Sequence, residues 1–276
     1  MRLPFAKYEG LGNDFVIVEL AEARAAFDTV LAARVCDRHL GVGADGVLLL
    51  DSESGRASMK VINADGSVPE MCGNGIRCVA LHLARAGKVT GQRFEIGTDA
   101  GPHACRVLQS SESGLVEVSM RPPSFLPADV PVLADAPLID APIEVAGQRL
   151  SITAVSIGNP HAVTFSDVGE QRMLLGPLLQ GHSRFPQGAN AGFARVLSPQ
   201  LLELHVYERG VGWTRACGTG ACAAAAAAVE TGRARRHEAI EVRLPGGSLS
   251  IVVAGDHERL SMTGPARHVF DGVIYV

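Results

Sequence analysis

The chain has 276 residues, of which 25 are basic and 29 are acidic, so its formal net charge is −4. A hydrophobic fraction of 47% excludes a largely disordered chain, because so many apolar side chains can bury enough surface to offset the entropy lost on folding. The mild acidity, without a run of Lys or Arg, argues against nucleic acid or an anionic membrane surface as a partner.

Residues 1–7 lack the apolar core of a signal peptide, and no stretch approaches the roughly 20 apolar residues that span a bilayer. The sequence therefore predicts a cytoplasmic protein with no membrane partner. Six cysteines are too few for a disulfide scaffold in a chain of this length, so reactive or buried thiols are expected. None of the three lysines, Lys7, Lys60 and Lys88, lies in a motif, so we expect no pyridoxal phosphate, and no other cofactor is predicted.

Short apolar runs bounded by Gly, Asp or Pro predict β-strands at residues 15–18, 46–50, 59–62, 115–120, 240–244 and 249–253. Two segments predict helices, residues 74–86 and 219–231. Each is followed by a glycine, Gly87 or Gly232, that suits the left-handed position just past a helix. The second helix contains six consecutive alanines at 223–228 and has no wide polar face, so we expect it to be buried with strands packed closely around it.

The two predicted helices begin with similar strings, MCGNG at 71–75 and ACGTG at 216–220, which are 145 positions apart. The same offset places Gly43-Ala44-Asp45 on Gly188-Ala189-Asn190 and Gly87 on Gly232, and an offset of 146 places Asn13 on Asn159. Because chance rarely holds such a register, the pattern indicates an internal duplication with two pseudo-symmetric halves. The Pro-rich stretch at 122–142 is the predicted linker.

Cys72 and Cys217 occupy equivalent positions, each before Gly-x-Gly and each at a helix N-terminus. The helix dipole and free backbone N–H groups there favour an anion and lower the pKa of a thiol. Two thiols that face each other across a bound carboxylate suit stereoinversion: one thiolate removes the α-proton and the opposite thiol delivers a proton to the other face. Backbone donors at Gly73, Asn74, Gly218 and Thr219 would stabilise the growing charge on the carboxylate, by about 3 kcal/mol each.

Two simpler interpretations compete with this one. A single cysteine near Gly-x-Gly is more often a buried hydrophobic side chain than a catalyst, but the matched pair favours catalysis. Zinc would use Cys72, Cys78, Cys217 and Cys222, but their spacings differ from the short Cys-x(2–4)-Cys pattern, so no metal is predicted. The thiols of Cys36, Cys78, Cys105 and Cys222 are therefore predicted to be core.

Six strings run in order along nearly the whole chain: GLGNDF (10–15), NADGS (63–67), MCGNG (71–75), GNPH (158–161), YERG (207–210) and ACGTGAC (216–222). Together they resemble the diaminopimelate epimerase family. The resemblance implies cofactor-independent conversion of LL-2,6-diaminopimelate into the meso form, in the synthesis of lysine and of peptidoglycan precursors, by a possible homodimer. It also implies an α/β (α+β) fold of two similar domains, each a curled mixed or antiparallel sheet around a central helix, with the last strand returning to the first domain. The implied boundaries are 1–119 plus 263–276, carrying Cys72, and 120–262, carrying Cys217.

The resemblance also implies the site residues. Cys72 and Cys217 match the acid–base pair, and His161 and Glu208 match the residues that assist the thiols. The substrate-binding positions match Asn13, Asn63, Gly73, Asn74, Asn159, Asn190, Glu208, Arg209, Gly218 and Thr219. Amides suit both an ammonium and a carboxylate, and Arg209 suits a carboxylate. Taken alone, any one Gly-Asn would more often be a turn.

The chain departs from the family pattern at two positions. Gly46 stands where some members have glutamine, and Trp213 stands where many have glutamate, so substrate detail is less certain than reaction type. Three alternatives remain. A proline- or hydroxyproline-type racemase, or another amino acid racemase, would use the same cysteine pair but typically has histidine at the position of Asn74. A phenazine-type isomerase would lack the thiols, and a metal or redox module would not be an enzyme.

Overall fold

The computed structural model describes residues 2–23, 27–53, 56–69, 71–255 and 258–275. The chain divides into two compact units, of which unit 1 contains Met1–Ser119 with Thr263–Val276 and unit 2 contains Met120–Met262. Strand β16 (Leu260–Tyr275) begins in unit 2 and continues in unit 1.

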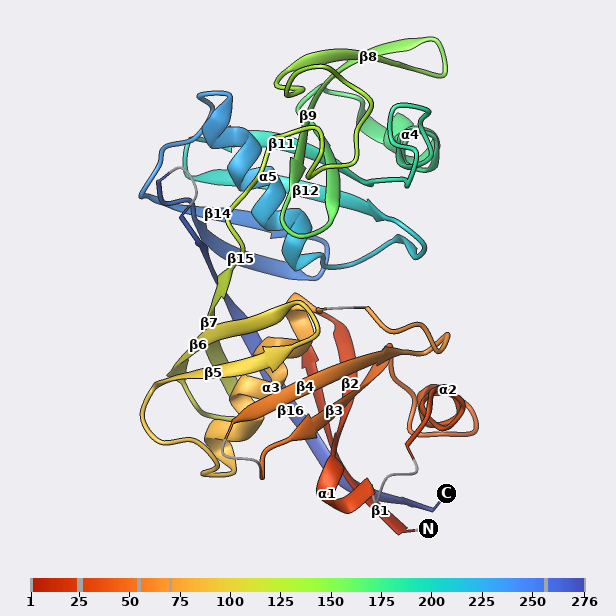
Figure 1. Ribbon diagram of the computed structural model, residues 1–276, viewed down its shortest axis with the longest axis vertical. Helices are drawn as coiled ribbons and strands as arrows, with labels where there is room; N and C mark the ends of the chain where they lie inside the picture. Colours follow the sequence, from red (N-terminus) through yellow and green to blue (C-terminus); the bar gives the residue numbers. More distant parts are fainter. Residues whose placement is uncertain (1, 24–26, 54–55, 70, 256–257, 276) are drawn as a thin grey trace. The chain divides into compact units, whose positions relative to one another are not determined.

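Unit 1 is a ring of strands around one helix (Figure 1). Strand order runs from β1 to β7 and then to β16, and β16 pairs with β1 to close the ring. The enclosed helix, α3 (Gly73–Arg85), contacts β1, β2, β3, β4 and β6. The other elements are β1 (Arg2–Gly10), β2 (Asn13–Glu19), α1 (Leu20–Ala23), α2 (Thr29–Cys36), β3 (Gly46–Asp51), β4 (Ala57–Asn63), β5 (Arg93–Thr98), β6 (Gly101–Gln109) and β7 (Ser113–Met120).

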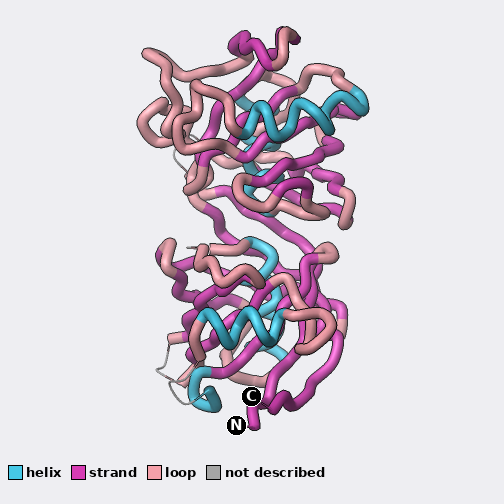
Figure 2. The backbone as a smooth tube through the Cα atoms, turned by 90° about the vertical axis from the view of Figure 1, so that its right-hand side faces the viewer, coloured by secondary structure: helices cyan, strands magenta, loops and turns pink. Residues whose placement is uncertain are grey.

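Unit 2 repeats this plan with a second central helix, α5 (Gly218–Glu230), which contacts β9, β10, β11, β12, β14 and β15. Its strand order is β15-β14-β12-β11-β10-β9-β8, and β13 pairs with β12. In each unit more of the backbone is strand than helix, and loops join the strands (Figure 2). The remaining elements are β8 (Ala141–Val145), β9 (Gln148–Ser156), β10 (Pro160–Thr164), the 3₁₀ helix η1 (Gly169–Gln171), α4 (Arg172–Gln180), β11 (Asn190–Ser198), β12 (Leu201–Glu208), β13 (Gly212–Trp213), β14 (Ala239–Leu244) and β15 (Gly247–Val252).

The ladder pattern of the two units confirms the predicted duplication. In unit 1, β1 to β6 pair successively as antiparallel, parallel, antiparallel, parallel and antiparallel neighbours. In unit 2, β9, β10, β11, β12, β14 and β15 pair in the same succession. The predicted α+β class with a mixed sheet around a central helix is therefore confirmed for each unit.

Both predicted helices are present, and each begins one residue earlier than expected. Gly87 and Gly232 follow them with φ of 66° and 73°, the left-handed conformation that glycine adopts without steric cost. The alanine run of α5 is buried as predicted, and so are the thiols of Cys36, Cys78, Cys105 and Cys222.

The predicted linker at 122–142 is wrong. Val130, Val132 and Leu138 are buried in the apolar core of unit 2, and Ser124 exchanges backbone hydrogen bonds with Ser156. Prolines and polar residues are typical of linkers, but here they belong to an irregular segment that packs against the sheet of unit 2. Among the helices that the structure describes, none is both long enough and apolar enough to cross a membrane.

Candidate active site

The two predicted catalytic thiols have the same local geometry. Cys72 is the N-cap of α3, with φ −133° and ψ 115°, and its Sγ accepts the backbone N–H of Gly75 at 3.4 Å. Cys217 is the N-cap of α5, with φ −126° and ψ 107°, and its Sγ accepts the backbone N–H of Gly220 at 3.3 Å. Each sulfur therefore takes the hydrogen bond that a Ser, Thr, Asp or Asn side chain usually accepts at a helix N-terminus.

Glycine at the third position after each thiol is required by the close approach of its neighbours. A Cβ at Gly220 would lie 3.0 Å from Val206 Cγ2 and 3.1 Å from the sulfur of Cys217, while a Cβ at Gly75 would lie 3.0 Å from Leu48 Cδ2. All three distances are shorter than ordinary van der Waals contact, so a side chain at Gly75 or Gly220 would displace its neighbours at the helix entrance. The repeated Gly-x-Gly therefore fixes each sulfur against its own helix.

Cys217 lies beside Glu208 in unit 2. The thiol donates a hydrogen bond to the Glu208 carboxyl, and Thr214 Oγ1 donates a second one to Glu208 Oε1 at 2.5 Å. Burial raises the pKa of Glu208, and these two hydrogen bonds only partly offset the effect. The result is a carboxyl group held in position to exchange a proton with the thiol.

The expected lowering of the thiol pKa by the helix is wrong for Cys217. Burial first, and the charge of Glu208 second, raise the pKa of this thiol well above its ordinary value, although Thr219 and Gly220 act in the opposite direction. The side chain is 4% exposed, so loss of water around the thiolate outweighs the favourable helix dipole. Cys217 is therefore a protonated thiol in this form. Cys72, by contrast, is partly exposed.

His161 is fully buried on β10, and its Nε2 lies 3.0 Å from Asn159 Oδ1. Because an amide oxygen only accepts, the imidazole donates from Nε2. Burial, together with the charge of Arg209, lowers the pKa of His161 to about 3. The ring is therefore neutral near pH 7 and carries its proton on the nitrogen that faces Asn159.

Unit 2 brings its other predicted binding residues to the same place. Asn159 Nδ2 donates to Thr219 Oγ1 at 3.3 Å, and this hydroxyl lies 3.6 Å from the sulfur of Cys217. Asn190 Oδ1 accepts the backbone N–H of Arg209 at 2.8 Å, and Asn190 Nδ2 donates to Pro160 O at 3.1 Å. All predicted residues of this half, including Gly218, therefore cluster at the entrance of α5.

Unit 1 groups most, but not all, of its predicted residues. Asn74 Nδ2 donates to Asn13 Oδ1 at 3.1 Å, beside Cys72 and Gly73 at the entrance of α3. Asn63 Nδ2 instead donates to Ser67 Oγ at 2.9 Å within its own turn. The amide of Asn63 therefore stabilises the turn at the end of β4, where Asn63 pairs with Gly46 of β3.

Both departures from the family pattern have a structural setting. A Cβ at Gly46 would lie 2.9 Å from the carbonyl oxygen of Ile62, so the close pairing of β3 and β4 leaves no space for a larger residue. The indole of Trp213 packs edge-on to Tyr207, with ring centroids 5.4 Å apart, and covers Gly176 of α4. Trp213 therefore anchors the hairpin between Glu208 and Thr214 on α4.

The sequence did not single out three polar residues that hold this machinery. Arg77 is fully buried and donates to the oxygens of Pro265, Gly73 and Asn74. Asp45 and Thr214 contact Asn13 and Glu208, respectively. Arg77 lies just after MCGNG in the predicted helix, and Thr214 lies just before ACGTG. Their proximity to these motifs was the one sequence signal that could have pointed to them.

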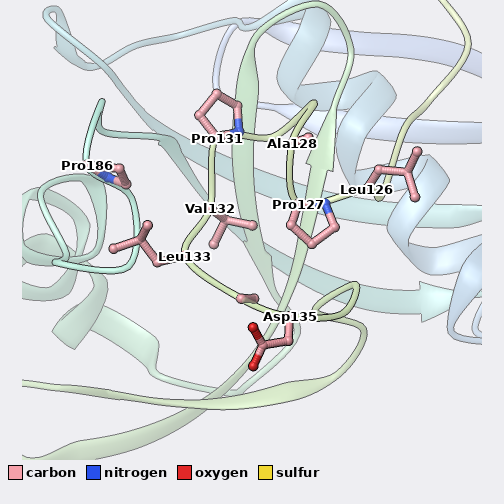
Figure 3. Close-up of a pocket in the computed structure, with 9 residues that line it drawn as sticks. Leu126, Pro127, Ala128, Pro131, Val132, Leu133, Asp135 and Pro186 are labelled. Carbon is pink, nitrogen blue, oxygen red and sulfur yellow. The ribbon is translucent and has the colours of Figure 1, made fainter.

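A separate pocket of about 670 Å³ lies in unit 2 (Figure 3). Its walls contain no predicted site residue and are mostly apolar, with Asp135 as the one ionisable side chain among them: Leu126, Pro127, Ala128, Pro131, Val132, Leu133, Ala134, Asp135 and Pro186. It lacks the paired acid and base that proton transfer needs. Within the described ranges, no three or more His, Cys, Asp or Glu side chains group so that they could hold a metal ion.

Solved structures share the fold of this chain at low sequence identity. A probable proline racemase from Agrobacterium radiobacter K84 matches with a TM-score of 0.70 and 16% identity, covering 99% of this chain and 93% of the other. A phenazine biosynthesis protein of the PhzF family from Bacillus anthracis matches with a TM-score of 0.73 and 14% identity, covering both chains fully. These likenesses establish the fold and leave the substrate open.

Sequence comparison is more specific. The chain is 46% identical over 277 residues to a diaminopimelate epimerase from Desulforudis audaxviator, covering 98% of each chain. It is 42% identical over 287 residues to a diaminopimelate epimerase from Microcystis aeruginosa, covering 99% of each. A family model described as diaminopimelate epimerase matches residues 5–126 and 153–269. The chain therefore belongs to the diaminopimelate epimerase family of isomerases.

Proposed function

We propose that this chain converts LL-2,6-diaminopimelate into the meso form without a cofactor, through Cys72 and Cys217. The observation that carries the proposal is the identical N-cap geometry of the two sulfurs, each bound to the third N–H of a central helix. The relatives named diaminopimelate epimerase support the substrate.

The reaction begins with one ionised and one protonated thiol. The Cys72 thiolate takes the α-proton from one face of the carbon, and the Cys217 thiol gives its proton to the other face. The inverted product therefore leaves a Cys72 thiol and a Cys217 thiolate, so the reverse reaction uses the same groups in exchanged roles. General acid–base transfer of this kind contributes about 10²- to 10⁴-fold to a rate.

The neighbouring residues have separate tasks in this proposal. Glu208 accepts the Cys217 proton when that sulfur must act as the base, and the neutral His161 keeps Asn159 directed at Thr219. The N–H groups of Gly73, Asn74, Gly218 and Thr219 stabilise the substrate carboxylate as its charge grows. Asn13, Asn63, Asn190 and Arg209 hold the second amino acid centre, which does not react.

A solvent-isotope experiment tests the reaction. Incubation with LL-diaminopimelate in deuterated water should introduce one deuterium at one α-carbon and none at the other, because a single stereocentre is exchanged. Proline and hydroxyproline, run alongside, test the alternative of a proline-type racemase. Deuterium in proline, with none in diaminopimelate, would replace the proposed substrate.

The proposal includes a cytoplasmic role in lysine and peptidoglycan precursor synthesis and a homodimer. Apolar side chains on β16 support self-association, because Val269 and Phe270 are each 45% exposed, and Tyr275 is 79% exposed. Sedimentation of the purified chain should give twice the mass of 28.9 kDa. A monomer at micromolar concentration would reject this part alone.

A further inference from the structure

A line of four hydrogen-bonded side chains crosses the candidate site of unit 1. Asn13 Nδ2 donates to Asp45 Oδ2 at 2.7 Å, Asn74 Nδ2 donates to Asn13 Oδ1 at 3.1 Å, and Arg77 Nη2 donates to Asn74 Oδ1 at 2.9 Å. The line thus begins at a carboxylate and ends at a buried guanidinium, with two amides between them.

The charged ends determine the direction of both amides. A carboxylate only accepts hydrogen bonds and a guanidinium only donates them. The amino group of each asparagine must therefore point toward Asp45 and each amide oxygen toward Arg77. Reversing either amide would bring two donors or two acceptors together, which costs a buried polar group its partner.

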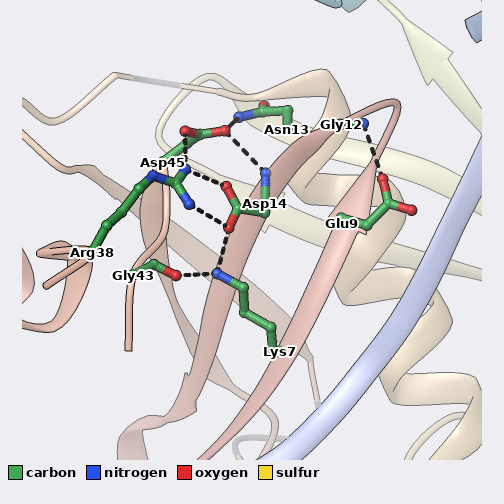
Figure 4. A network of polar contacts seen from close by, with 8 residues as sticks. All are labelled: Lys7, Glu9, Gly12, Asn13, Asp14, Arg38, Gly43 and Asp45. Carbon is green, nitrogen blue, oxygen red and sulfur yellow. Dashed lines mark hydrogen bonds and ion pairs between the residues drawn. The ribbon is translucent and has the colours of Figure 1, made fainter. Parts of the chain in front are cut away.

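Asp45 is itself held firmly (Figure 4). Its Oδ1 accepts from Arg38 Nη2 at 2.8 Å, and its Oδ2 also accepts the backbone N–H of Asp14 at 3.0 Å. Arg38 in turn bonds both carboxylate oxygens of Asp14, which is paired with the buried Lys7. The acceptor at the end of the line is therefore preorganised by charged neighbours on its own loop and on strands β1 and β2.

The duplication shows that this arrangement is particular to unit 1. Asn13, Asn74 and Asp45 correspond to Asn159, Thr219 and Asn190 by the sequence offsets. Asn159 and Thr219 are also bonded, but in the opposite direction, because Asn159 donates whereas Asn13 accepts. The third position holds an amide that bonds to Arg209 and Pro160 instead. Only the half that carries Asp45 ends its line in a carboxylate.

We propose that Asp45 is a positioning residue that keeps the amide of Asn13 in the orientation that binds the substrate. The inference rests on the proposed function, which assigns Asn13 to substrate binding. Arg77 still orients Asn74 without the carboxylate, but Asn13 is then held from one side only, so its amide can turn and only a fraction of the molecules is ready to bind. Saturating substrate selects that fraction, so KM rises and kcat is retained.

Kinetics of two variants test this proposal. Asp45→Asn keeps the shape but removes the carboxylate that accepts from Asn13 Nδ2, and we expect KM for diaminopimelate to rise about five-fold with kcat within two-fold of the wild type. The matched control is Arg38→Gln, which removes the same ion pair and a second one to Asp14 but leaves the carboxylate on Asn13. Its KM should stay within two-fold. An unchanged KM in Asp45→Asn, or an equal rise in Arg38→Gln, would overturn the assignment.

A second readout needs no substrate and separates this inference from the proposed reaction. In protein labelled with ¹⁵N-asparagine, the side-chain amide signals of Asn13 and Asn74 are identified by their loss on substitution to alanine. We expect one sharp pair from each in the wild type and in Arg38→Gln. In Asp45→Asn we expect a doubled or exchange-broadened pair from Asn13 and a sharp pair from Asn74, which Arg77 still holds. A sharp single pair from Asn13 in Asp45→Asn would refute the positioning role. An inactive wild type with this NMR pattern would reject the reaction alone.

Discussion

Cysteine replaces the usual Ser, Thr, Asp or Asn at the N-cap of both central helices. A hydroxyl would satisfy the same backbone N–H group but would hold its proton far more tightly than sulfur does at neutral pH. The choice of residue therefore favours proton transfer over helix stability, and it recurs at both equivalent positions of the duplication. This recurrence is the reason to test the two sulfurs with the same substitution.

Cys72→Ser and Cys217→Ser should each lower kcat by at least about 10³-fold, because either variant lacks one partner of the proposed proton exchange. The measurement is the conversion of LL- to meso-diaminopimelate by chiral chromatography. The melting temperature should change little, since serine is a good N-cap. Substantial turnover by either variant would contradict the two-thiol mechanism.

Cys222→Ala is the matched control for these variants. Cys222 lies in α5 five residues after Cys217, is fully buried, and precedes the alanine run. Its loss removes a sulfur from the same helix without touching the proposed reacting groups. We expect kcat and KM within two-fold of the wild type. A large fall in kcat for this control would indicate that activity depends on the packing of α5 rather than on Cys217.

Glu208→Gln tests the role of the carboxyl beside Cys217. Burial first and Glu208 second raise the pKa of that thiol, so removing the negative charge should lower the pKa while burial keeps it above its ordinary value. At the same time, kcat should fall about 10²-fold because glutamine cannot accept the proton. Thiolate absorbance near 240 nm, taken as a difference from Glu208→Gln/Cys217→Ser, measures the shift. A Cys217 titration midpoint at a higher pH in Glu208→Gln than in the wild type would refute the contact between Glu208 and the thiol.

At the scale of elements, α3 and α5 occupy the same place in their units but fill it differently. Leu81 of α3 is fully buried and occupies the space that a side chain at Gly114 of β7 would need. Its counterpart in α5 is Ala226, 2% exposed within the alanine run. The two central helices therefore fill equivalent positions with side chains of different volume, while the two units keep the same ladder pattern.

Exchanging these residues should destabilise both units. Leu81→Ala leaves a cavity and is expected to cost about 2–5 kcal/mol, whereas Ala226→Leu overpacks a full interior and is expected to cost about 1–3 kcal/mol or more. Urea unfolding followed by circular dichroism measures both. Val30→Ala, at a position on α2 that is 67% exposed, is the control and should change the free energy of unfolding little. A neutral Ala226→Leu would show that the unit 2 core has unfilled space.

The sequence predicted these helices because their signals are local. Gly87 and Gly232 end them, and the apolar strand at residues 46–50 is bounded by Gly46 and Asp51. Residue patterns alone did not predict β16, which only the family resemblance implied, because it contains Gly264, Pro265 and Gly272 and is held by pairing with β1 at the opposite end of the chain. A helix at Arg172–Gln180 was missed because Pro177 lies inside it.

The same difference between local and long-range signals separates the site residues that were predicted from those that were missed. The thiols were predicted because a repeated motif marks them, whereas Arg77 was not, because its role depends on Pro265, which lies 188 residues later. Asp45 and Thr214 likewise act through contacts that only folding creates. Single-sequence patterns therefore pointed to the proposed reacting atoms more readily than to the residues that would position them.

At the scale of the whole molecule, resistance to acid is distributed unevenly between the units. In unit 1, burial alone would raise the pKa of Asp14 and Glu19, but hydrogen bonds and charges from Arg38 and Lys7, and from His82 and Lys88, lower both to about 2. In unit 2, burial raises the pKa of Glu208, whereas burial and the charge of Arg209 lower the pKa of His161 from 6.5 to about 3. Acid therefore removes stabilising contacts from unit 1. In unit 2 it favours the folded form at Glu208 but opposes it at His161, because the unfolded chain protonates this histidine at a higher pH than the folded chain does.

The sign and size follow from proton linkage. A carboxyl whose pKa is lowered on folding adds stability that is present above its unfolded pKa, near 4, and is lost as the pH falls toward about 2. Asp14 and Glu19 should each contribute about 2–3 kcal/mol in this window. Glu208 has the opposite sign, since its contribution is complete at low pH and is lost as the pH rises through its raised pKa.

We therefore expect unit 2 to lose stability at a higher pH than unit 1 on acidification, because His161 begins to oppose folding near its unfolded pKa of 6.5 and the two carboxyls only near pH 4. Trp213 is the single tryptophan and lies in unit 2, so its fluorescence reports that unit, whereas far-ultraviolet circular dichroism reports both. The fluorescence should change first, and part of the dichroism should be lost later, between about pH 4 and pH 2. Glu19→Gln, which removes the titrating group and its contacts with His82 and Lys88, should flatten this later phase and lower stability at pH 7. Coincident transitions would show that the two units unfold together, and loss of dichroism before the Trp213 signal changes would contradict the assignment of the earlier acid sensitivity to unit 2.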